Sequence, residues 1–461
     1  MDLFRQLSAQ GAMIQRLSSD SRRCAPGVAF LAYPGETADG RAHIGDAIAR
    51  GAAAVLWDDR KFLWNPEWRV PNLPVPELKQ QAGALAHEFY GRPSESLWVC
   101  GVTGTNGKTS CSQWIAALLK NTAVIGTLGA GFPGALSAAR NTTPDAAETH
   151  FLLKEFLKQG AAAVAMEVSS HGLVQGRVNG VRFSCALFTN LTHDHLDYHG
   201  SMASYAAAKA RLFDMPGLQA AVLNLDDAFG VELARRLAGR VRTIGYSLSP
   251  RKAPVDESIV ATPGMRIPVL GRFNVSNALG VLGCLVANGI PLEEGVRLLE
   301  ALPPVPGRMQ AVGEEPLVVI DYAHTPDALE NVLQALRPVA AARGGRFAVV
   351  FGAGGDRDPT KRPLMGAIAA RLADRVLITS DNPRSEDPLA IISQIQKGIQ
   401  GKHEVEPDRA RAIEKIISSA EKKDVVLIAG KGHETVQEIA GRRLHFSDEE
   451  HARSALARRT G

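Results

Sequence analysis

The stretch LWVCGVTGTNGKTSCSQWIAALL, residues 97–119, decides the fold of the central part of the chain. Its apolar start, Leu97–Val102, predicts a strand, and Cys111–Leu119 predicts a helix. The glycine-rich segment between them predicts a loop whose backbone N–H groups approach phosphate oxygens at the N-terminus of the helix. Lys108 can reach the β- and γ-phosphates of a nucleotide, and Thr109 can bind Mg²⁺. We therefore predict a phosphate-binding loop in a nucleotide-binding α/β domain.

The loop departs from the strict phosphate-loop motif, because Val102 stands where the first glycine is expected, and a chance glycine turn is the alternative. A nicotinamide-binding fold is disfavoured, since Arg357 takes the last glycine position in the later segment 352–357. No Asn-Lys-x-Asp tetrapeptide, the guanine-reading motif of GTPases, occurs in the chain. The predicted ATP-binding residues of the loop are Gly104, Thr105, Asn106, Gly107, Lys108, Thr109 and Ser110.

The length of the chain, 461 residues, predicts about three domains at roughly 150 residues per domain. Hydrophobic residues make up 45% and charged residues 22% of the sequence, as in ordinary soluble globular proteins. No apolar run reaches the roughly 18–20 residues that cross a bilayer. The first ten residues, MDLFRQLSAQ, lack the pattern of an export signal. We therefore expect a cytoplasmic protein with no membrane partner.

Cysteine usage and charge narrow the class of partner. The five cysteines are scattered and form no CxxC pair, which favours a reducing compartment and disfavours a disulfide framework or a zinc ribbon. The net charge of +4 is small, and no Lys/Arg run is long enough for a nucleic-acid-binding surface. We expect a monomer whose partners are small anionic substrates, with no nucleic acid.

Strand and helix patterns alternate along the whole chain and predict an α/β fold of three domains. We place an N-terminal UDP-substrate-binding α/β domain at 1–88 and a central domain with a parallel sheet like that of phosphate-loop ATPases at 89–305. A C-terminal Rossmann-like α/β domain follows at 306–461. Outside the phosphate loop, the predicted strands are 28–33, 53–57, 161–168, 185–191, 220–224, 317–320, 346–351, 375–379 and 425–429. The predicted helices include 43–50 and 205–213, and the segment 65–76 predicts a loop.

Polar side chains follow several of these strands, at the sheet edge where ligands bind in open parallel sheets. Glu167 lies inside an apolar strand, where an unpaired carboxylate is costly to bury. We interpret it as a Mg²⁺ ligand, with a buried ion pair to an arginine as the alternative. The segment THDHLDYH, residues 192–199, allows a zinc site, but one histidine that serves Mg²⁺ or the γ-phosphate fits better beside a phosphate loop. Lys209, considered alone, would be a solvated lysine of a helix.

Taken together, these motifs resemble the Mur ligases, and most closely the member of that family that adds the third amino acid of the stem peptide. The resemblance extends over nearly the whole chain. It is carried by DSR (20–22), GVTGTNGKTS (101–110), NTTPD (141–145), MEVSSHGLVQGRV (166–178), TNLTHDHLDYHG (189–200), AAK ending at Lys209, GRFNVSNALG (271–280), PGRMQ (306–310), DYAHTPDAL (321–329), GDRD (355–358), DNPR (381–384) and GKGHE (430–434).

The resemblance implies roles for particular residues. ATP would be bound by the loop together with Asn141, Asn277, Arg308 and Asp321. The metal ligands would be Thr109, Glu167, His195 and Lys209, with Lys209 carrying a carbamate derived from CO₂. The catalytic residues would be Lys108, Glu167, His195 and Lys209. The UDP-N-acetylmuramoyl dipeptide would be held by Ser19, Ser21, Glu36, Thr37, Ala38, Thr142, Thr143, Ser169, Gln175 and Arg177. The turn 36–38 is less typical of the family than the other motifs.

The resemblance also implies the amino acid that is added. The residues that match enzymes using meso-2,6-diaminopimelate are Arg357, Asp381, Asn382, Pro383, Arg384, Gly430 and Glu434. This substrate has a distal carboxylate and ammonium. Arg384 can bind the carboxylate through two parallel hydrogen bonds, and Glu434 can accept the ammonium. The alternatives are that Arg384 merely caps a loop, or that the chain adds lysine.

The implied reaction has two steps. The γ-carboxylate of D-Glu attacks the γ-phosphate of ATP and forms an acyl phosphate, and the amine of diaminopimelate then displaces phosphate. Mg²⁺ and Lys108 would offset the charge on the transferred phosphoryl group. A folate-extending ligase is a remoter alternative, because it would need neither DNPR nor the N-terminal DSR domain. A phosphate-loop switch or motor would leave the third domain's motifs without a role.

Overall fold

The computed structural model describes residues 2–36, 38–139, 141–262 and 264–460. Thr37, one of the predicted UDP-sugar contacts, therefore lies outside the described residues. The chain forms two compact units. The first comprises Met1–Leu191, His199–Met265 and Leu279–Leu298, and the second comprises Thr192–Tyr198, Arg266–Ala278 and Leu299–Gly461. Within the described part of the chain, no helix is both long and apolar enough to span a membrane.

The first sheet belongs to unit 1 and has four parallel strands in the order β1 (Arg16–Ser18), β2 (Val28–Ala32), β3 (Ala54–Trp57) and β4 (Asn72–Pro74). The helical elements of this region are α1 (Asp2–Ala9), η1 (Ser21–Arg23), η2 (Gly40–His43), α2 (Ile44–Ala49) and α3 (Leu78–Phe89). The expectation of a loop over 65–76 is wrong in part, because β4 lies there. Its backbone pairs with β3, although its proline and asparagine argue against a strand.

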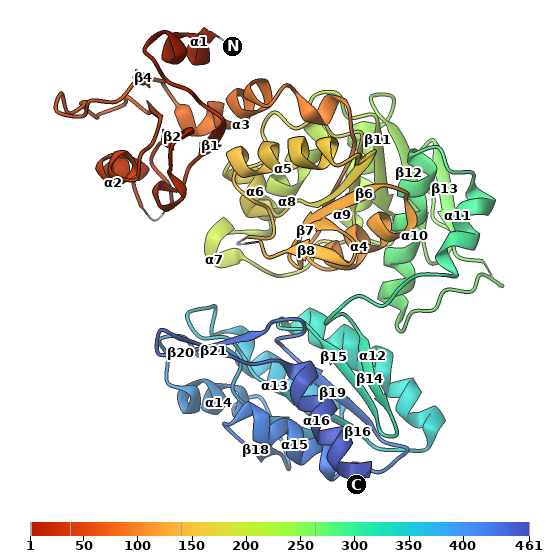
Figure 1. Cartoon of the computed structure of the whole chain (residues 1–461). Helices are drawn as coiled ribbons and strands as arrows, with labels where there is room; N and C mark the ends of the chain where they lie inside the picture. The colour runs from red at the N-terminus through yellow and green to blue at the C-terminus, as the bar shows by residue number, and fades with distance from the viewer. Residues whose placement is uncertain (1, 37, 140, 263, 461) are drawn as a thin grey trace. The chain divides into compact units, whose positions relative to one another are not determined.

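The second sheet, also in unit 1, has nine strands in the order β13-β12-β11-β10-β5-β9-β6-β7-β8 (Figure 1). Their bounds are β5 Trp98–Thr103, β6 Thr122–Gly126, β7 Gly129–Phe132, β8 Ala135–Ser137, β9 Ala163–Glu167, β10 Cys185–Phe188, β11 Ala220–Asn224, β12 Arg242–Ser247 and β13 Glu257–Val260. The helical elements from η3 to α11 are η3 Pro93–Glu95, α4 Lys108–Leu118, α5 Ala146–Lys158, α6 Ser170–Val174, α7 Leu196–His199, α8 Met202–Ala210, η4 Arg211–Asp214, α9 Ala228–Leu237, α10 Arg272–Ala287 and α11 Leu292–Leu299.

The central sheet corrects three sequence expectations. It is mixed rather than wholly parallel, because β7 and β8 pair antiparallel at one edge; short strands joined by tight turns can only pair in that way. Helix α4 begins at Lys108 rather than Cys111, directly after Gly107. Strand β10 ends at Phe188 rather than Leu191, and the residues that follow it bind the phosphate loop instead of extending the sheet.

The third sheet lies in unit 2 and has six strands in the order β14-β15-β19-β16-β17-β18. Only β14 pairs antiparallel. The strands are β14 Gln310–Glu314, β15 Leu317–Asp321, β16 Phe347–Phe351, β17 Arg375–Ile378, β18 Glu404–Val405 and β19 Val425–Ala429, and a separate hairpin joins β20 Val436–Ile439 to β21 Arg442–His445. The helices are α12 Pro326–Arg343, α13 Lys361–Leu372, α14 Pro388–Gln396, α15 Arg409–Ser418 and α16 Asp448–Thr460.

Helices cover both faces of this third sheet (Figure 1). One hydrophobic cluster joins the sheet to α12, α13 and α14, and a second joins the opposite face to α15 and α16. Strands buried on both faces explain the continuous apolar runs that the sequence shows. The carboxyl ends of β15, β16, β17 and β19 therefore meet at one edge, which is the edge that carries the polar motifs.

Candidate active site

The phosphate loop connects β5 to α4 and is held by the chain that follows the neighbouring strand β10. Thr105 N donates to Asn190 O at 2.8 Å, and Asn106 N donates to Asn190 Oδ1 at 2.9 Å. Gly104 has φ +152°, and a Cβ at this position would collide with Thr189 Oγ1. The loop therefore needs glycine at 104 both for its backbone angle and for space.

Glu167 ends β9 beside this loop and is only 1% exposed. Its carboxylate accepts hydrogen bonds from Thr127 N at 2.8 Å and from the hydroxyls of Thr127 and Thr109 at 3.1 Å each. No arginine pairs with it among the described residues, so the alternative of a buried ion pair with an arginine is wrong. A buried carboxylate held only by neutral donors, next to a threonine hydroxyl, is an oxygen donor set that suits Mg²⁺.

Lys209 lies on α8 and is 1% exposed, so it is not the solvated helix lysine that its sequence context alone predicts. Its Nζ donates to Gly104 O at 2.7 Å and lies 4.3 Å from the ring centroid of Tyr205. The Nζ of Lys108 donates to the same carbonyl at 2.8 Å. Two ammonium groups thus converge on one carbonyl oxygen, where their like charges repel each other. A carbamate on Lys209 would turn this repulsive pair into an attractive one.

The histidine-rich segment divides between the two units. His195 has φ +53° and lies in the 192–198 stretch of unit 2, where its Nε2 is 3.3 Å from Asp194 Oδ2. His199 belongs to unit 1, and its Nε2 lies 2.9 Å from Ser170 Oγ. Among the described residues, the group whose ligand atoms lie within reach of one ion is made of three cysteines rather than of these histidines. The zinc alternative therefore gains no support.

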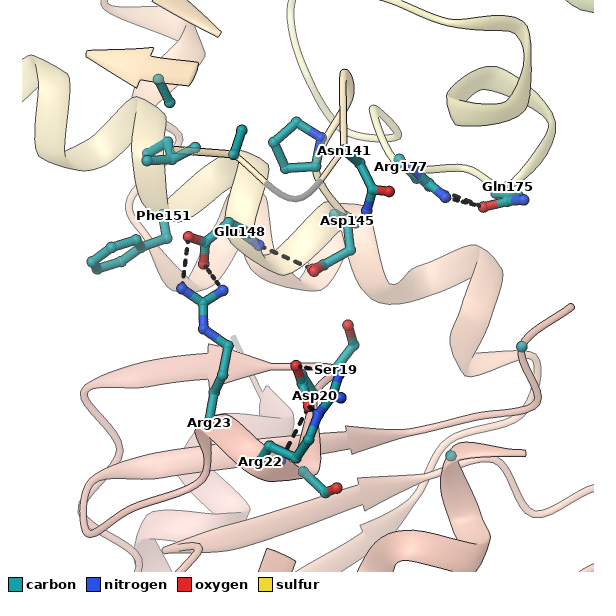
Figure 2. Close-up of a pocket in the computed structure, with 18 of the residues that line it drawn as sticks. Ser19, Asp20, Arg22, Arg23, Asn141, Asp145, Glu148, Phe151, Gln175 and Arg177 are labelled. Atoms are coloured by element: carbon teal, nitrogen blue, oxygen red, sulfur yellow. Dashed lines mark hydrogen bonds and ion pairs between the residues drawn. The ribbon is translucent and has the colours of Figure 1, made fainter. Parts of the chain in front are cut away.

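A cavity of about 1300 Å³ lies in unit 1, lined by the N-terminal strands' loops and by α5 and the segments around it. Of the predicted substrate residues, it is lined by Ser19, Ser21, Glu36, Ala38, Gln175 and Arg177. Asn141, predicted to approach ATP, also lines it. In Figure 2 Arg23 points across the cavity to Glu148 at 3.1 Å, and Arg177 pairs with Gln175 at 2.6 Å.

The cavity continues by hydrogen bonds to Glu167. Arg177 Nη1 donates to Thr143 O at 2.8 Å, and Thr143 Oγ1 donates to Glu167 O at 2.9 Å. Thr143 Oγ1 also lies 3.1 Å from Ser169 Oγ, while Thr142 Oγ1 lies 3.0 Å from Thr127 Oγ1. The bonds through Arg177 and Thr143 therefore lead from the cavity to the backbone carbonyl of Glu167, and Thr142 reaches its carboxylate through Thr127.

Sequence reasoning missed several residues of this region. The cavity lining includes the cations Arg22, Arg23, Arg50 and Lys79. Three of these cations pair with acids of the same lining, as Arg22 does with Asp20 and Arg23 with Glu148, so the lining is mixed in charge. Arg22 is the last residue of the DSR motif, and Arg23 follows it directly. The sequence alone indicated no role for either. Thr127, which supplies two of the bonds to Glu167, stands in no motif. Its position beside Glu167 depends on the pairing of β6 with β9.

The diaminopimelate residues gather at the carboxyl ends of β16, β17 and β19 in unit 2. Asn382 Nδ2 donates to Glu434 Oε2 at 2.8 Å. Gly430 has φ +117°, and a Cβ there would meet Asp381 Oδ2 at 2.5 Å. Asp381 is 7% exposed, and its Oδ2 has no hydrogen-bond partner within the described residues. A buried carboxylate oxygen without a partner favours a cationic ligand group.

Two arginines flank this cluster. The closest atom to a Cβ built on Gly354 would be Arg384 Nη1, and Arg357 Cγ would be next. Arg384 Nη1 donates to Gly355 O at 2.7 Å, and its backbone pairs with Glu438 and Ala440 beside β20. Arg384 therefore does anchor a loop, as the alternative supposed. Its guanidinium is still 25% exposed and has five N–H donors in all, so it retains donors for a carboxylate.

The remaining nucleotide predictions also fall in unit 2. Asp321 is 7% exposed and accepts from Met309 N at 2.7 Å and from Ala323 N at 2.8 Å. Burial raises the pKa of its carboxyl, although Arg308 opposes the rise. The Arg308 guanidinium lies 4.3 Å from the ring centroid of Tyr322. Asn277 Nδ2 donates to Asn274 Oδ1 at 3.4 Å. Their contacts with ATP remain predictions.

Family models match three consecutive parts of the chain. Residues 13–90 match the Mur ligase family catalytic domain, residues 102–285 the Mur ligase middle domain, and residues 307–432 the Mur ligase glutamate ligase domain. These matches agree with the predicted α/β fold of three domains. The boundaries at 88/89 and 305/306 are not tested by them and remain proposals.

Individual proteins are similar over nearly the whole length. A UDP-N-acetylmuramoyl-L-alanyl-D-glutamate–2,6-diaminopimelate ligase from Pseudomonas aeruginosa is 51% identical over 96% of this chain and 95% of its own. A protein of the same name from Nitrosomonas europaea is 48% identical over 96% of this chain and 93% of its own. A solved structure of a ligase with this name is 36% identical, covers 97% of this chain and 96% of its own, and superposes with a TM-score of 0.66.

Proposed function

The chain belongs to the Mur ligase family, and we propose that it is the MurE-type member, which adds meso-2,6-diaminopimelate to UDP-N-acetylmuramoyl-L-alanyl-D-glutamate with consumption of ATP. This reaction forms one amide bond of the peptidoglycan precursor. We further propose that the protein acts in the cytoplasm as a monomer, with domains 1–88, 89–305 and 306–461.

The observation that carries the proposal is the mixed charge of the cluster at the ends of β16, β17 and β19. Arg384 and Arg357 both lie next to Gly354. Asp381 and Glu434 add carboxylates to the same cluster, and Asn382 is bonded to Glu434. The distal end of diaminopimelate carries one carboxylate and one ammonium, so it can bind groups of both charges at once. Lysine has no distal carboxylate for the arginines.

The UDP-linked dipeptide suits the cavity of unit 1. Its diphosphate would compete with the acids of the lining for the arginines and Lys79. Its D-Glu γ-carboxylate would extend along Thr143 and Thr142 toward Glu167. ATP suits the loop 104–110, whose Lys108 would contact the β- and γ-phosphates. When bound to Thr109, Glu167, His195 and carbamylated Lys209, Mg²⁺ would offset negative charge on the phosphates.

In the proposed mechanism, the D-Glu γ-carboxylate attacks the γ-phosphorus of ATP, and the bond from that phosphorus to the ADP oxygen breaks. Lys108 stabilises the charge that builds on the transferred group. The amine of diaminopimelate then attacks the acyl carbon, the new C–N bond forms, and inorganic phosphate leaves. Asp381 and Glu434 hold the distal ammonium, and Arg384 holds the distal carboxylate, so that the reacting amine is oriented.

Lysine addition is the nearest alternative, and it differs only in the distal group that the third sheet must recognise. A folate-extending ligase is remoter, since it would have no use for the cations of the N-terminal cavity. A regulatory phosphate-loop ATPase would turn over ATP without an amino acid.

One experiment separates these functions. Purified protein receives ATP, Mg²⁺ and UDP-N-acetylmuramoyl-L-alanyl-D-glutamate, with diaminopimelate, lysine or no amine in parallel reactions. We expect phosphate release that depends on diaminopimelate and a product whose mass has grown by that residue. Equal phosphate release without an amine, or a product that contains lysine instead, would refute the proposal.

A further inference from the structure

Lys431 is fully buried in unit 2, although lysine is almost never buried without partners. It stands in the segment GKGHE, between Gly430 and Glu434, and sequence reasoning gave it no role. Its Nζ donates to Val436 O at 2.7 Å, to Glu434 Oε2 at 2.9 Å and to Asn382 Oδ1 at 3.1 Å. All three donors of the ammonium group are therefore used. Two of its acceptors are side chains of the proposed diaminopimelate site.

These bonds fix the orientation of both neighbours. Asn382 Oδ1 accepts from Lys431 and from Glu438 N, so its Nδ2 must point to Glu434 Oε2. Glu434 Oε2 thus receives two donors from the protein. Within the described parts of the chain, its other oxygen, Oε1, has a single long contact, 3.5 Å from Tyr322 Oη. The arrangement presents one defined carboxylate oxygen, Oε1, to a ligand.

Lys431 also forms an ion pair with this carboxylate. The adjacent His433 does not contribute, because burial, followed by the charges of Arg308 and Lys431, lowers its pKa to about 3. Arg409, which lies near the strand ends, forms an ion pair with Asp448 at 2.7 Å, and both side chains are 0% exposed. Lys431 is therefore the cation in direct contact with Glu434, at 2.9 Å. A compensated carboxylate attracts a bare ammonium less strongly than a free one would.

We infer that Lys431 is a positioning residue that also enforces substrate choice: by neutralising Glu434 it disfavours a side chain ending in a lone ammonium, such as lysine. A side chain that ends in both an ammonium and a carboxylate loses less binding affinity, because its carboxylate still binds Arg384. The inference rests on the proposed function, and it assigns the discrimination against lysine to a residue that need not touch the substrate.

The test uses Lys431→Met, which keeps the length of the side chain and removes its charge and donors. The measured quantity is kcat/KM for lysine divided by kcat/KM for diaminopimelate. We expect this ratio to rise about tenfold, the effect of one charge-assisted contact, with a higher KM for diaminopimelate. Lys415→Met, on the exposed side of α15, is the matched control and leaves the ratio unchanged.

Lys431→Gln separates charge from hydrogen bonding and carries the test if the methionine variant does not fold. It retains two N–H donors, so we expect a KM for diaminopimelate nearer the wild type but a ratio still raised. An unchanged ratio in Lys431→Gln overturns the inference. Wild-type protein that makes no diaminopimelate product refutes the proposed function instead, so the two failures are distinguishable.

A different observation carries a second inference, in the central sheet. Cys100 on β5 and Cys185 on β10 are register partners on neighbouring strands, and Cys284 lies on α10. All three are 0% exposed, and their sulfur atoms lie within 4.8 Å of one another, with Cys100 Sγ 3.7 Å from Cys284 Sγ. Three thiolates around one ion at metal–sulfur distances of about 2.3 Å would have sulfurs roughly 4.0 Å apart. The cluster is close to that spacing without rearrangement.

We propose that Cys100, Cys185 and Cys284 form a site for one thiophilic cation of the Cu(I) type. Three soft ligands in an apolar, water-excluded position suit trigonal Cu(I) better than Zn²⁺, which takes four. Binding replaces S–H bonds by S–metal bonds, and the thiol protons pass to solvent with no change in oxidation state.

The full chain is incubated with Cu(I) without oxygen, in competition with a coloured Cu(I) chelator. We expect one ion per chain, three sulfur neighbours by X-ray absorption and a higher unfolding temperature. Cys284→Ala and Cys185→Ala should each lose the ion, whereas Cys24→Ala, a buried cysteine outside the cluster, should keep it. The proposal is overturned if the wild-type protein takes up no Cu(I) in competition with the chelator. It is also overturned if the wild-type protein binds Cu(I) no more tightly than Cys284→Ala and Cys185→Ala do.

Discussion

Glu167 in unit 1 and Glu434 in unit 2 are carboxylates whose charges are compensated in different ways. Glu167, in unit 1, is held by threonine hydroxyls and a backbone N–H, and no cation of the described residues pairs with it. Glu434, in unit 2, forms an ion pair with Lys431, and nearby Arg409 forms an ion pair with Asp448. The first arrangement leaves a full negative charge for an incoming cation. The second is nearly neutral and suits a ligand that carries both charges. The chemistry of each site follows from what compensates its carboxylates.

The largest effect is expected from Lys209→Ala, which removes the group that we propose to become a carbamate. Loss of an anionic group at the phosphate loop should lower kcat by on the order of 100- to 1000-fold. Short carboxylates added to the assay should restore part of the activity. Circular dichroism checks the fold, and Lys158→Ala, in an exposed ion pair, is the control. Full activity of Lys209→Ala would remove the carbamate from the mechanism.

A smaller loss, confined to unit 2, is expected from Arg384→Ala. A charge-assisted contact is worth roughly 1.5–3 kcal/mol, or about 10–150-fold in the KM for diaminopimelate. ATP binding should stay nearly intact, since Arg384 belongs to the amino-acid cluster. Arg384→Lys keeps the charge but cannot form two parallel hydrogen bonds, so it should recover only part of the affinity. Normal use of diaminopimelate by Arg384→Ala would refute the assignment of the distal carboxylate.

Thr127→Val tests the neutral hydrogen bonds that hold Glu167 in unit 1. It removes one neutral hydrogen bond to Glu167 and leaves the backbone bond in place. The loss of about 1 kcal/mol should raise the Mg²⁺ concentration for half-maximal rate roughly fivefold. The KM for diaminopimelate should not change, which serves as the internal control. A shift in the diaminopimelate KM with none in the Mg²⁺ dependence would contradict the assignment of Glu167.

The smallest effect concerns the loop that carries Arg357. Buried Arg362 binds Glu386 at 2.8 Å and Gly354 O at 3.0 Å, and it lowers the pKa of Glu386 to about 2. An acid whose pKa is depressed by folding stabilises the protein above its unfolded value of 4.5 and loses that contribution as the pH falls toward 2.

Glu386→Gln should therefore lower the unfolding temperature at pH 7 by roughly 2–4 °C, the shift that about 1 kcal/mol produces in a domain of 150–250 residues. The difference from wild type should shrink as the pH is lowered from 4.5. Glu421→Gln, at a carboxylate that is 78% exposed, is the control. A difference that stays constant with pH would show that the Arg362 pair does not titrate.

The phosphate loop was predictable because its function depends on neighbours in sequence. Gly104, Lys108 and Thr109 lie within one turn and the start of one helix, so the motif alone indicates their chemistry. The diaminopimelate residues were found only through family resemblance, since Arg357, Arg384 and Glu434 come from three separate segments. Nothing local distinguishes Arg384 from a loop cap, and the structure shows it in that role as well as beside the cluster.

The amino-acid sequence by itself determined the α/β class, the phosphate loop, about half of the strands of the three sheets and the presence of a polar residue at each critical strand end. Only the tertiary structure decided what those residues touch. Thr127 contacts Glu167, Lys209 contacts Gly104, and Lys431 donates to Asn382 across 49 residues of chain. Such contacts depend on the order and register of the strands. Because these partners decide how each buried charge is compensated, the charge of each site cannot be predicted from the local sequence.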